Sequence, residues 1–586
     1  MLALVLFATT LQTDINGDRG PFATDIGEIQ NALPRWGILH FHSYPLYSLL
    51  GSAFVTLLRP MGIQPAMGAS LYSAVWGAIC VGLLVAIARA IDVPPLASAG
   101  GGLILALSTS MWVDSSIAEI HTMTTALMLG ALFAAVRYGR GGQRRDLLWL
   151  AFLTGQAVAH QPASVLLGPA LAVLILRQWR ALPGMLRRTL PAAMGLALLG
   201  PLTYLYLPIR AWQGADWMYG SPGTWQGFRQ MMTYKKPRTV MPETLAGWLE
   251  QGKRTIELLT DDLPLVLLAL GLLGLLWAAR RGRWTETLGL SLVWVAYQGV
   301  TVIIWEGRVS DAQLAAKILV VAMAALGVSV WVGVGSTRWR WFGAISALVL
   351  LVVAGFLYAD HRSTVLDITR EPKAEQIIAV VSQIEPAGDG KPIALTALWG
   401  MDYWALAYAQ EYREGMPEYQ LVKHNADFEA ILERGEHLVT PAHTFYAWSP
   451  ERWKQRLGDF YLSSFAPEVI EMSPRPLLGE RDIPPGEPFP LGNGVTVRHA
   501  SVTWRDVDRL HLVVYWQAEG SWRTTASPST WCRRTPQPAR RTSWSRQTET
   551  TPSAAGARRA SGGRERSCAT YIRWTFLQGR RREPSA

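Results

Sequence analysis

"FATDIGEIQNALPRWGILHFHSYPLYSLLG", residues 22–51, is the stretch on which the interpretation of this chain depends. Two carboxylates, Asp25 and Glu28, lie three residues apart, and two histidines, His40 and His42, follow them. The run 44–58 comes next and is shorter than the roughly 20 apolar residues that a membrane-spanning helix needs. Ionisable groups beside a membrane segment are costly and usually mark a working site.

The remainder of the chain has the pattern of a mostly α, polytopic membrane protein. Of its 586 residues, 50% are hydrophobic and only 17% are charged, and long apolar runs recur up to about Tyr358. A soluble multidomain protein does not keep so many long runs almost free of charge. We predict an interfacial or re-entrant helix over 44–58 and about eleven transmembrane helices, over residues 1–12, 67–88, 96–113, 117–136, 147–160, 162–177, 189–207, 263–279, 286–305, 312–333 and 341–358. Residues 1–12 lack the basic flank and cleavage site of a signal peptide, so we interpret them as a membrane helix.

The positive net charge comes from one end of the chain. The formal net charge is +11, and residues 521–586 hold 14 arginines and 3 glutamates, so the remainder is neutral. We therefore predict no nucleic-acid partner. Residues 521–586 lack Val, Asp, Asn, Lys, His and Met and begin within a strand-like stretch. This composition favours a shifted reading frame, and a disordered basic tail is the alternative.

Arginine placement predicts the orientation in the membrane. Four connections are rich in arginine, at residues 137–145, 177–188, 280–283 and 338–340. The positive-inside rule assigns all four to the cytoplasm. The N-terminus is then inside, whereas the first loop 13–66, the loop 208–262 and everything after Tyr358 are outside. We predict an integral membrane protein, with the lipid bilayer as a partner.

Several ionisable side chains fall at or near this outer face, and together they indicate a cavity open to the outer interface. They are Asp25, Glu28, His40, His42, Glu119, His121, His160, Arg210 and Asp311. Structural roles are the alternatives. Asp25 and Glu28 could be solvated loop acids, and Glu119 could cap a helix. His160 could satisfy backbone carbonyls at a helix end, and Arg210 could be an interfacial snorkelling residue.

The loop 208–262 is rich in aromatic residues, among them Trp217 and Trp225. Flat rings beside polar groups suit the faces of sugars, so we consider both as stacking residues for a sugar or an acceptor. Trp and Tyr also gather at any membrane interface, and that alternative stays open.

Beyond Tyr358 the pattern becomes that of a soluble protein. Alternating strands and helices over 359–475 predict an extracytoplasmic α/β domain with a largely parallel sheet. The predicted strands lie within 391–400, 419–424 and 437–441, and the predicted helices cover 402–413, 426–434 and 449–457. Strand-like segments within 485–520 predict part of a β-sandwich.

The chain shows no P-loop, nucleophile elbow or dinucleotide fingerprint. His40 and His42 supply two of the three or four ligands that a zinc site requires, so we assign no metal motif. The outer acids could still hold a divalent cation, Mg²⁺ or Mn²⁺, although nothing in the sequence requires one.

The opening stretch resembles a known family. "DIGEIQNALPRWGILHFHSYPLYSLLG" is similar to the D-S-G-E … H-P-P-G-Y-P-L-Y stretch of the bacterial domain-of-unknown-function 2723 proteins, which are related to the protein O-mannosyltransferases of the GT-C glycosyltransferase superfamily. Further matches follow in chain order: "SMWVDSSIAEIHTM", "AVAHQPAS" and "LYLPIRAWQGADWMYGSPGTWQGF". Phe41-His42-Ser43, His121 and Ser221 depart from the family pattern, which affects the expected acceptor more than the reaction.

The resemblance implies a GT-C-like transmembrane domain over 1–358 and a transferase reaction. GT-C enzymes take a sugar from a polyprenyl-phosphate carrier and transfer it on the extracytoplasmic side, and their first outer loop carries a catalytic acid. Asp25 occupies that place. The sugar could be mannose, and the acceptor a protein or a cell-envelope glycan. The resemblance to bacterial proteins also implies that the membrane is a bacterial cytoplasmic membrane.

A mechanism follows as a hypothesis. Asp25 is the general base, and Glu28 orients the acceptor or keeps Asp25 poised. Arg210 binds the donor phosphate because a guanidinium forks onto phosphate oxygens, with His40 and His160 assisting. The run 44–58 and its neighbours form an apolar groove for the polyprenyl chain.

Two other functions stay open at this point. A transporter or flippase of lipid-linked sugars also has many spans and buried charges. An inactive membrane scaffold could present the outer domain to a partner.

Overall fold

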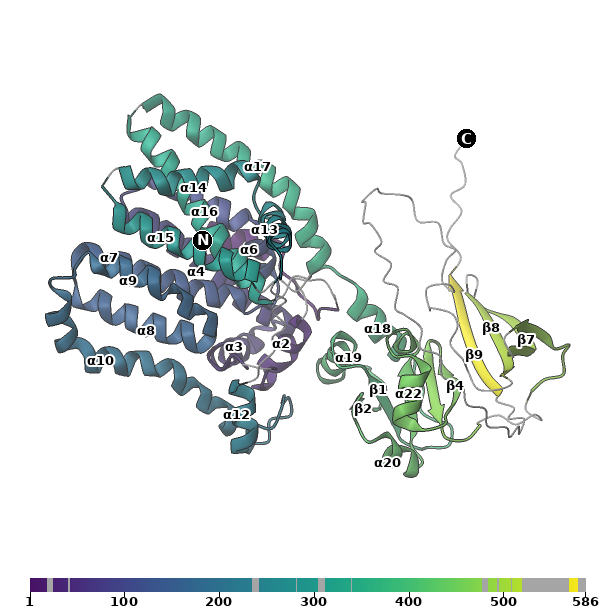
Figure 1. Cartoon of the computed structure of the whole chain (residues 1–586). Coiled ribbons are helices and arrows are strands. Elements are labelled where there is room, and N and C mark those ends of the chain that lie inside the picture. Colours follow the sequence, from purple (N-terminus) through teal and green to yellow (C-terminus); the bar gives the residue numbers. More distant parts are fainter. Residues whose placement is uncertain are drawn as a thin grey trace, which may run out of the picture. The chain divides into compact units, whose positions relative to one another are not determined.

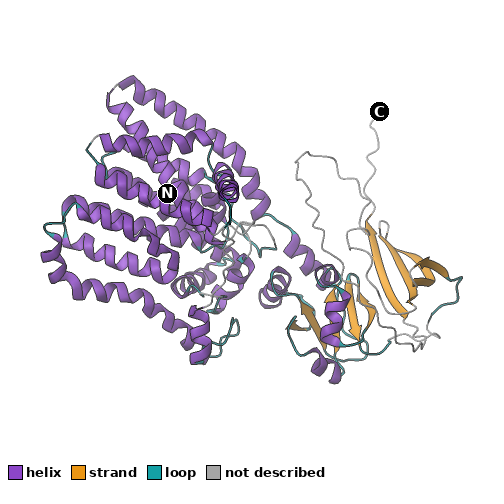
Figure 2. Cartoon of the chain, in the orientation of Figure 1, coloured by secondary structure: helices purple, strands orange, loops and turns teal. Residues whose placement is uncertain are grey.

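The chain is represented by a computed structural model that describes residues 1–17, 25–40, 43–233, 242–280, 282–303, 311–338, 340–476, 483–492, 495–506, 509–518 and 569–577. It divides into two compact units. Unit 1 comprises Met1–Gln376 and Gly400–Arg413, and unit 2 comprises Ile377–Trp399 and Glu414–Ala586. Unit 1 is helical, whereas the strands of the two sheets belong to unit 2 (Figures 1 and 2).

Helices form over every segment for which the sequence predicts a span. In unit 1 they are α1 (Leu2–Thr9), α2 (Ile26–Ala32), α3 (Pro45–Leu58), α4 (Pro65–Ala90), α5 (Pro95–Leu107), α6 (Thr109–Ser116), α7 (His121–Gly141), α8 (Arg144–His160), α9 (Gly168–Leu176), α10 (Leu182–Leu202), α11 (Tyr206–Trp212), α12 (Trp225–Thr233), α13 (Leu245–Thr260), α14 (Leu265–Arg280), α15 (Trp284–Ile303), α16 (Asp311–Arg338), α17 (Arg340–Thr369) and α19 (Met401–Tyr412). Short 3-10 turns lie at η1 (Leu33–Arg35), η2 (Arg59–Met61), η3 (Pro162–Leu167) and η4 (Thr203–Leu205). Helix α18 (Lys373–Val381) runs from unit 1 into unit 2.

Helix α16 is the centre of unit 1. Its residues 315–330 are buried, and it packs against α14, α15, α5 and α17. The contact with α14 is a close backbone approach, since a Cβ on Gly274 would lie 1.9 Å from the Gly327 carbonyl oxygen. Small residues at a helix crossing allow such close approach in membrane proteins.

Four helices among the described residues are long and apolar enough to cross a membrane, and six are if each bent pair is one span. The bent pairs are α5 with α6, at 66°, and α13 with α14, at 99°. The structure therefore supports an integral membrane protein, and the count of eleven crossings stays a prediction. Helix α3, 14 residues long, is the helix predicted over 44–58, and its length is below that of a spanning helix.

Unit 2 contains a five-stranded sheet in the order β2-β1-β3-β5-β4. Strand β1 (Ile393–Ala397) pairs in parallel with β2 (Gln420–Lys423) and β3 (His437–Pro441), while β4 (Tyr461–Ala466) and β5 (Val469–Ser473) form an antiparallel hairpin beside β3. The helices α20 (Phe428–Glu433), α21 (Thr444–Ala447) and α22 (Pro450–Leu457) follow β2 and β3. Trp453, Phe428 and Trp448 form the apolar core between helices and sheet.

A second, antiparallel sheet in unit 2 has the order β6-β7-β8-β9. Its strands are β6 (Phe489–Gly492), β7 (Val495–Asp506), β8 (Arg509–Ala518) and β9 (Ala569–Leu577). The structure thus shows one sheet where the sequence predicts part of a sandwich. Strand β9 falls within the segment 521–586 and pairs with β8. The origin of that segment stays a prediction.

Two predicted boundaries differ from the structure. The limit at residue 358 falls inside α17, because the charged residues after Tyr358 continue the helix and the first proline is Pro372. The helix predicted over 402–413 forms as α19, but it belongs to unit 1 and not to the α/β domain. The reason is its buried apolar surface, which packs against α2.

A histidine in unit 2 makes the stability of that unit depend on pH. His437 lies 2.7 Å from Glu471 Oε1 and 2.9 Å from Asp389 Oδ1. Burial opposes the charged ring, but hydrogen bonds to the two carboxylates outweigh it and raise the pKa of His437. A raised histidine pKa stabilises the folded state below the unfolded value of about 6.5, and this contribution is lost as the pH rises through the folded value.

We therefore expect the melting temperature of the detergent-solubilised chain to fall more between pH 6 and pH 8.5 in the wild type than in His437→Gln. Intrinsic-fluorescence melting curves measure this. Parallel pH profiles for the two proteins would contradict the prediction.

Candidate active site

Three ionisable side chains of the first loop meet in unit 1. The Glu28 carboxylate, on a residue 1% exposed, accepts a hydrogen bond from the His40 backbone N–H at 3.0 Å and lies 2.7 Å from His40 Nδ1. His40 Nε2 lies 3.4 Å from Asp25 Oδ2, and 24% of the Asp25 side chain is exposed. The imidazole therefore faces a carboxylate with each nitrogen. The buried acid holds the ring, and the second acid reaches the surface.

The local sequence positions the residues of this cluster. Asp25 precedes α2, and its backbone carbonyl accepts hydrogen bonds from the N–H groups of Glu28 and Ile29, which starts the helix. An acid is favourable at a helix N-terminus. Glu28 lies three residues on, so it shares the side of α2 on which Asp25 lies. Ile38 pairs with Met218 and so fixes the segment that leads to His40.

A strained turn directs Tyr44 toward the cluster. Ser43 and Tyr44 have φ of 55° and 39°, a region in which non-glycine residues are uncommon and cost about 1–3 kcal/mol each. The Ser43 backbone N–H donates to the His40 carbonyl at 2.7 Å. The Tyr44 ring then lies edge-on to His40, with centroids 6.2 Å apart, and 5.6 Å from the ring of His160.

A small cavity joins the acid cluster to a second acidic group. Asp25, His40, Tyr44 and Glu119 all line it. Behind Glu119, His121 Nδ1 lies 3.5 Å from Glu119 Oε1 and 3.0 Å from Asp114 Oδ2. Glu119, His121 and Asp114 are buried. The structure thus brings together five of the residues predicted at the outer face: Asp25, Glu28, His40, Glu119 and His121.

Sequence reasoning missed a buried ion pair behind this site. Lys317 of α16, 3% exposed, lies 3.4 Å from Asp262, which is fully buried. Asp262 also accepts hydrogen bonds from the backbone N–H and the hydroxyl of Ser110 on α6. A single lysine within the apolar run 312–333 was the available signal, because charges inside membrane segments are almost always paired.

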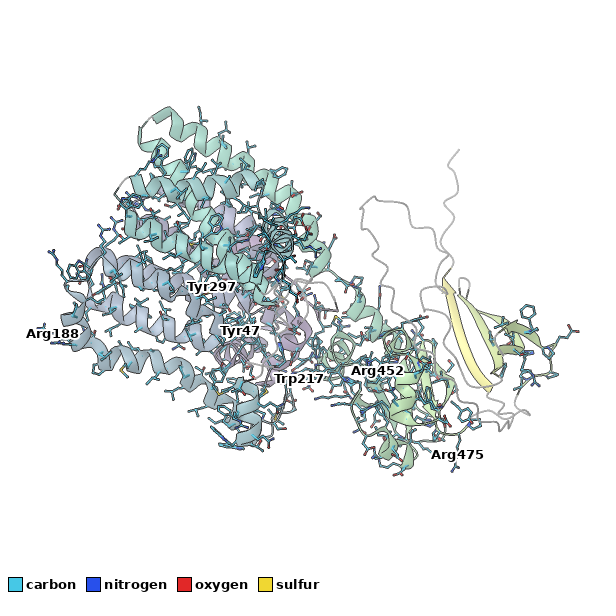
Figure 3. The ribbon with its side chains drawn as sticks, in the orientation of Figure 1. Tyr47, Arg188, Trp217, Tyr297, Arg452 and Arg475 are labelled. Carbon is cyan, nitrogen blue, oxygen red and sulfur yellow. The ribbon has the colours of Figure 1, made fainter. Side chains whose placement is uncertain are left out.

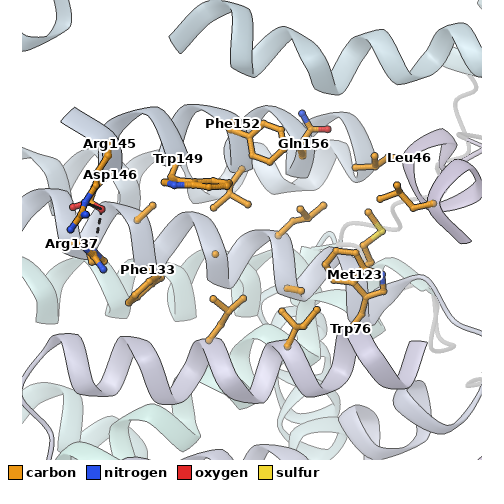
Figure 4. A pocket seen from close by; sticks show the side chains of 18 residues that line it. Leu46, Trp76, Met123, Phe133, Arg137, Arg145, Asp146, Trp149, Phe152 and Gln156 are labelled. Carbon is orange, nitrogen blue, oxygen red and sulfur yellow. Dashed lines mark ion pairs between the residues drawn. The ribbon is translucent and has the colours of Figure 1, made fainter. Parts of the chain in front are cut away.

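A large apolar cavity of about 580 Å³ lies between α4, α7 and α8, with α3 at one end. At that end it is lined by Leu46, Trp76, Met123 and Gln156, and at the other by an ion pair between Arg137 and Asp146, with Arg145 beside it (Figure 4). The lining between the ends is almost wholly hydrocarbon and aromatic: Leu50, Ile79, Leu83, Ala126, Leu127, Gly130, Phe133, Ala134, Trp149, Phe152 and Leu153. Such a cavity suits a long, unbranched or isoprenoid chain.

Arg210 on α11 is engaged in holding the chain that follows α2. Its Nε donates to the Trp36 carbonyl at 2.7 Å, and its two terminal nitrogens donate to Gln213 Oε1 and to the Arg35 carbonyl. The guanidinium thus makes three hydrogen bonds to described residues, and the Tyr206 hydroxyl interacts with it as well. The predicted phosphate contact stays a prediction.

His160, the last residue of α8, is 1% exposed and packs against the rings of Tyr44 and Tyr47. The helix ends there because Pro162 disfavours helical conformation in the preceding residue. Gln156, one turn earlier on α8, lines the apolar cavity. His160 therefore lies beside Tyr44, which lines the small cavity, and its contact with a donor stays a prediction.

The two candidate stacking residues differ in exposure. Trp217 is 5% exposed, and its predicted sugar-stacking role stays a prediction. Its ring packs 6.1 Å from Tyr403 and 5.4 Å from the Arg35 guanidinium. Trp225 is 75% exposed beside Phe228, so its predicted role stays open.

Figure 3 shows Arg188, of a predicted cytoplasmic connection, at the end of unit 1 remote from Trp217.

Two predicted residues cannot be placed. His42 lies outside the described residues, and Asp311 begins α16 in a stretch whose side chains are not described.

Asp25, Glu28 and His40 could also hold a divalent cation. One ligand atom from each lies within 4.8 Å of the others. The set of two carboxylates and one imidazole suits Mn²⁺ or Zn²⁺. A cation would have to replace a contact between the His40 ring and a carboxylate.

This site lies at the start of the segment that matches a protein-family model. Residues 25–182 match the model of the "Protein O-mannosyl-transferase TMEM260 N-terminal domain". The mouse protein O-mannosyl-transferase TMEM260 is 28% identical over 238 residues, which cover 38% of this chain and 31% of the mouse protein. The chain therefore spans about a third of the length of that relative.

Solved structures extend the likeness to most of the chain. The crystal structure of apo ArnT from Cupriavidus metallidurans has a TM-score of 0.52 at 13% identity, covering 80% of this chain and 96% of ArnT. The fold resembles that of a GT-C glycosyltransferase. ArnT bound to undecaprenyl phosphate matches over the same shares, with a TM-score of 0.50 at 14% identity. These findings support the GT-C-like fold, and the narrower assignment to the domain-of-unknown-function 2723 proteins stays a prediction.

Proposed function

We propose that this chain is a GT-C-type membrane glycosyltransferase that transfers a sugar from a polyprenyl-phosphate carrier to a protein or cell-envelope glycan. The mouse relative, a protein O-mannosyl-transferase, favours mannose as the sugar. The observation that carries the proposal is the Asp25–His40–Glu28 cluster, of which Asp25 and His40 line a cavity in the segment matched by the O-mannosyl-transferase model. Solved ArnT with its undecaprenyl phosphate supports the class of donor. The first loop then faces the extracytoplasmic side.

Asp25 is the general base in this proposal. The acceptor hydroxyl attacks the anomeric carbon of the donor and loses its proton to Asp25. A new carbon–oxygen bond forms as the bond from the anomeric carbon to the phosphate oxygen breaks. Asp25 fits this role better than Glu28, because Glu28 is buried and engaged with His40. Glu28 and His40 then orient Asp25.

The leaving group is the lipid phosphate, which departs with the bonding electron pair as an anion and therefore needs positive donors more than an acid. Arg210, which is held beside the first loop by the Trp36 and Arg35 carbonyls, is the candidate donor. The apolar cavity that begins at Leu46 takes the polyprenyl chain, because its lining offers almost no polar group. The acidic network of Glu119, His121 and Asp114 borders the pocket for the sugar.

The proposal is tested by incubating purified protein in liposomes with a radiolabelled polyprenyl-phosphate sugar and envelope extract, then measuring label in protein or glycan. Label transferred by the wild type supports a transferase. Label that crosses the liposome membrane without changing its carrier would identify a transporter or flippase. Donor binding with neither outcome would identify an inactive scaffold.

Metal removal gives a further prediction. Each ring nitrogen of His40 faces a carboxylate, so the cluster is held together without an ion. We expect transfer after dialysis against EDTA to stay within about twofold of the untreated level, a change smaller than the loss of one catalytic group. A loss restored by Mn²⁺ or Mg²⁺ but not by Ca²⁺ would contradict this and place a cation in the cluster.

A further inference from the structure

Helix α2 has a second face that the proposed reaction does not use. Gly27, Asn31 and Arg35 recur every four residues, so they lie along one side of α2 and of η1, which continues it. All three contact α19. Helix α19 belongs to unit 1, although it is encoded between strands β1 and β2 of unit 2.

The contacts between the two helices are close and specific. A Cβ on Gly27 would lie 3.1 Å from the Cβ of Trp404, so only glycine allows this approach without displacement. Asn31, fully buried, donates from Nδ2 to the Trp404 carbonyl at 2.9 Å and to the Gly27 carbonyl at 2.7 Å. Arg35 donates to the Ala407 carbonyl at 2.8 Å. One side of α2 is thus fixed along its whole length.

Helix α19 is itself anchored at its far end. The Tyr408 hydroxyl accepts a hydrogen bond from the Ala66 N–H at the start of α4. Arg413, just after the helix, pairs with Glu375 and lies 2.8 Å from Asp14. Gln30 on α2 reaches the same N-terminal segment, because it accepts from the Asn16 N–H at 2.8 Å. The helix that carries the acids is therefore held between two anchored segments.

We propose that α19 sets the rotation of α2 and so aims Asp25 at the pocket and Glu28 at His40, with Asn31 and Trp404 as positioning residues. Rotation of a short helix about its axis moves every side chain on it, and a misplacement of about 1 Å can cost about 10²-fold in rate. The segment between β1 and β2, which forms α19, is therefore part of the transferase site. The rate effect rests on the proposed function, whereas the rotational constraint does not.

Hydrogen exchange tests the constraint without any activity. In Trp404→Ala we expect faster amide exchange in peptides that cover 26–35, with unchanged exchange in α16. Trp404→Phe, which keeps a ring at the Gly27 contact, should restore protection. If Trp404→Ala does not fold, Asn31→Ala, which removes one side chain's hydrogen bonds, serves in its place. Unchanged exchange in 26–35, or equal loss of protection in α16, would overturn the proposal.

The transfer assay tests the consequence. We expect Asn31→Ala and Trp404→Ala to lower kcat about 10²-fold while KM for the donor stays near the wild-type value, since neither residue touches the donor in this proposal. Glu411→Gln, at an exposed position on α19, is the matched control and should keep full activity. A variant in which amide exchange in 26–35 is faster but kcat equals the wild-type value would overturn the positioning role. If the wild-type protein transfers no sugar although the amides of α2 are protected from exchange, the proposed function is overturned instead.

Discussion

Asp25→Asn is expected to lower sugar transfer about 10²–10⁴-fold, the contribution that a positioned general base makes. The amide keeps the size of the side chain and a hydrogen-bonding oxygen, but it cannot take a proton from the acceptor hydroxyl. Asp25 reaches the surface and lines the small cavity, whereas its neighbour Glu28 is enclosed. Substitution of Asp25 should therefore affect kcat far more than donor binding. Initial rates of label transfer at saturating donor, with the donor affinity measured separately, give the result.

Asp360→Asn is the matched control, since 62% of that side chain is exposed on α17 and it lies outside the cluster. The control should retain wild-type activity. Transfer by Asp25→Asn at close to the wild-type rate would remove Asp25 as the base. Glu119, the other acid on the same cavity, would then be the next candidate.

Asp262→Ala is expected to destabilise unit 1 by about 3–5 kcal/mol, because it removes one partner of the buried ion pair with Lys317. The same change removes the acceptor of two hydrogen bonds from Ser110. These bonds tie the break between α13 and α14 to α6, the short helix that carries Asp114. The melting temperature in detergent, followed by intrinsic fluorescence, measures the effect.

The double variant Asp262→Leu/Lys317→Met supplies the comparison, because replacing both charges by apolar groups of similar volume is often neutral. We expect it to recover most of the stability lost in Asp262→Ala. If Asp262→Ala melts at the wild-type temperature, the ion pair contributes nothing. If the double variant is as unstable as the single one, the loss comes from the hydrogen bonds of Ser110.

The sequence alone was sufficient to locate the long apolar helices of unit 1 and the acidic first loop, but not helices α2, α12 and α13, which lie in predicted loops. Hydropathy is a local property, so each predicted span coincides with a helix, and the run 44–58 coincides with the short α3. The spacing of Asp25 and Glu28 predicted a shared side of α2, which the structure shows. The strands and helices of the α/β domain were likewise predicted from local periodicity.

Only the tertiary structure decided which distant residues meet. Asn31 and Trp404 are 373 residues apart, so no local pattern could move α19 out of the α/β domain and onto α2. Trp217 looked like an exposed interfacial ring, yet Arg35 and Tyr403 enclose it. Hydropathy and spacing determine which segments form helices and which face is apolar, because those depend on neighbours in the chain. Packing decides which side chains meet at a site, because that depends on which helices the fold brings into contact.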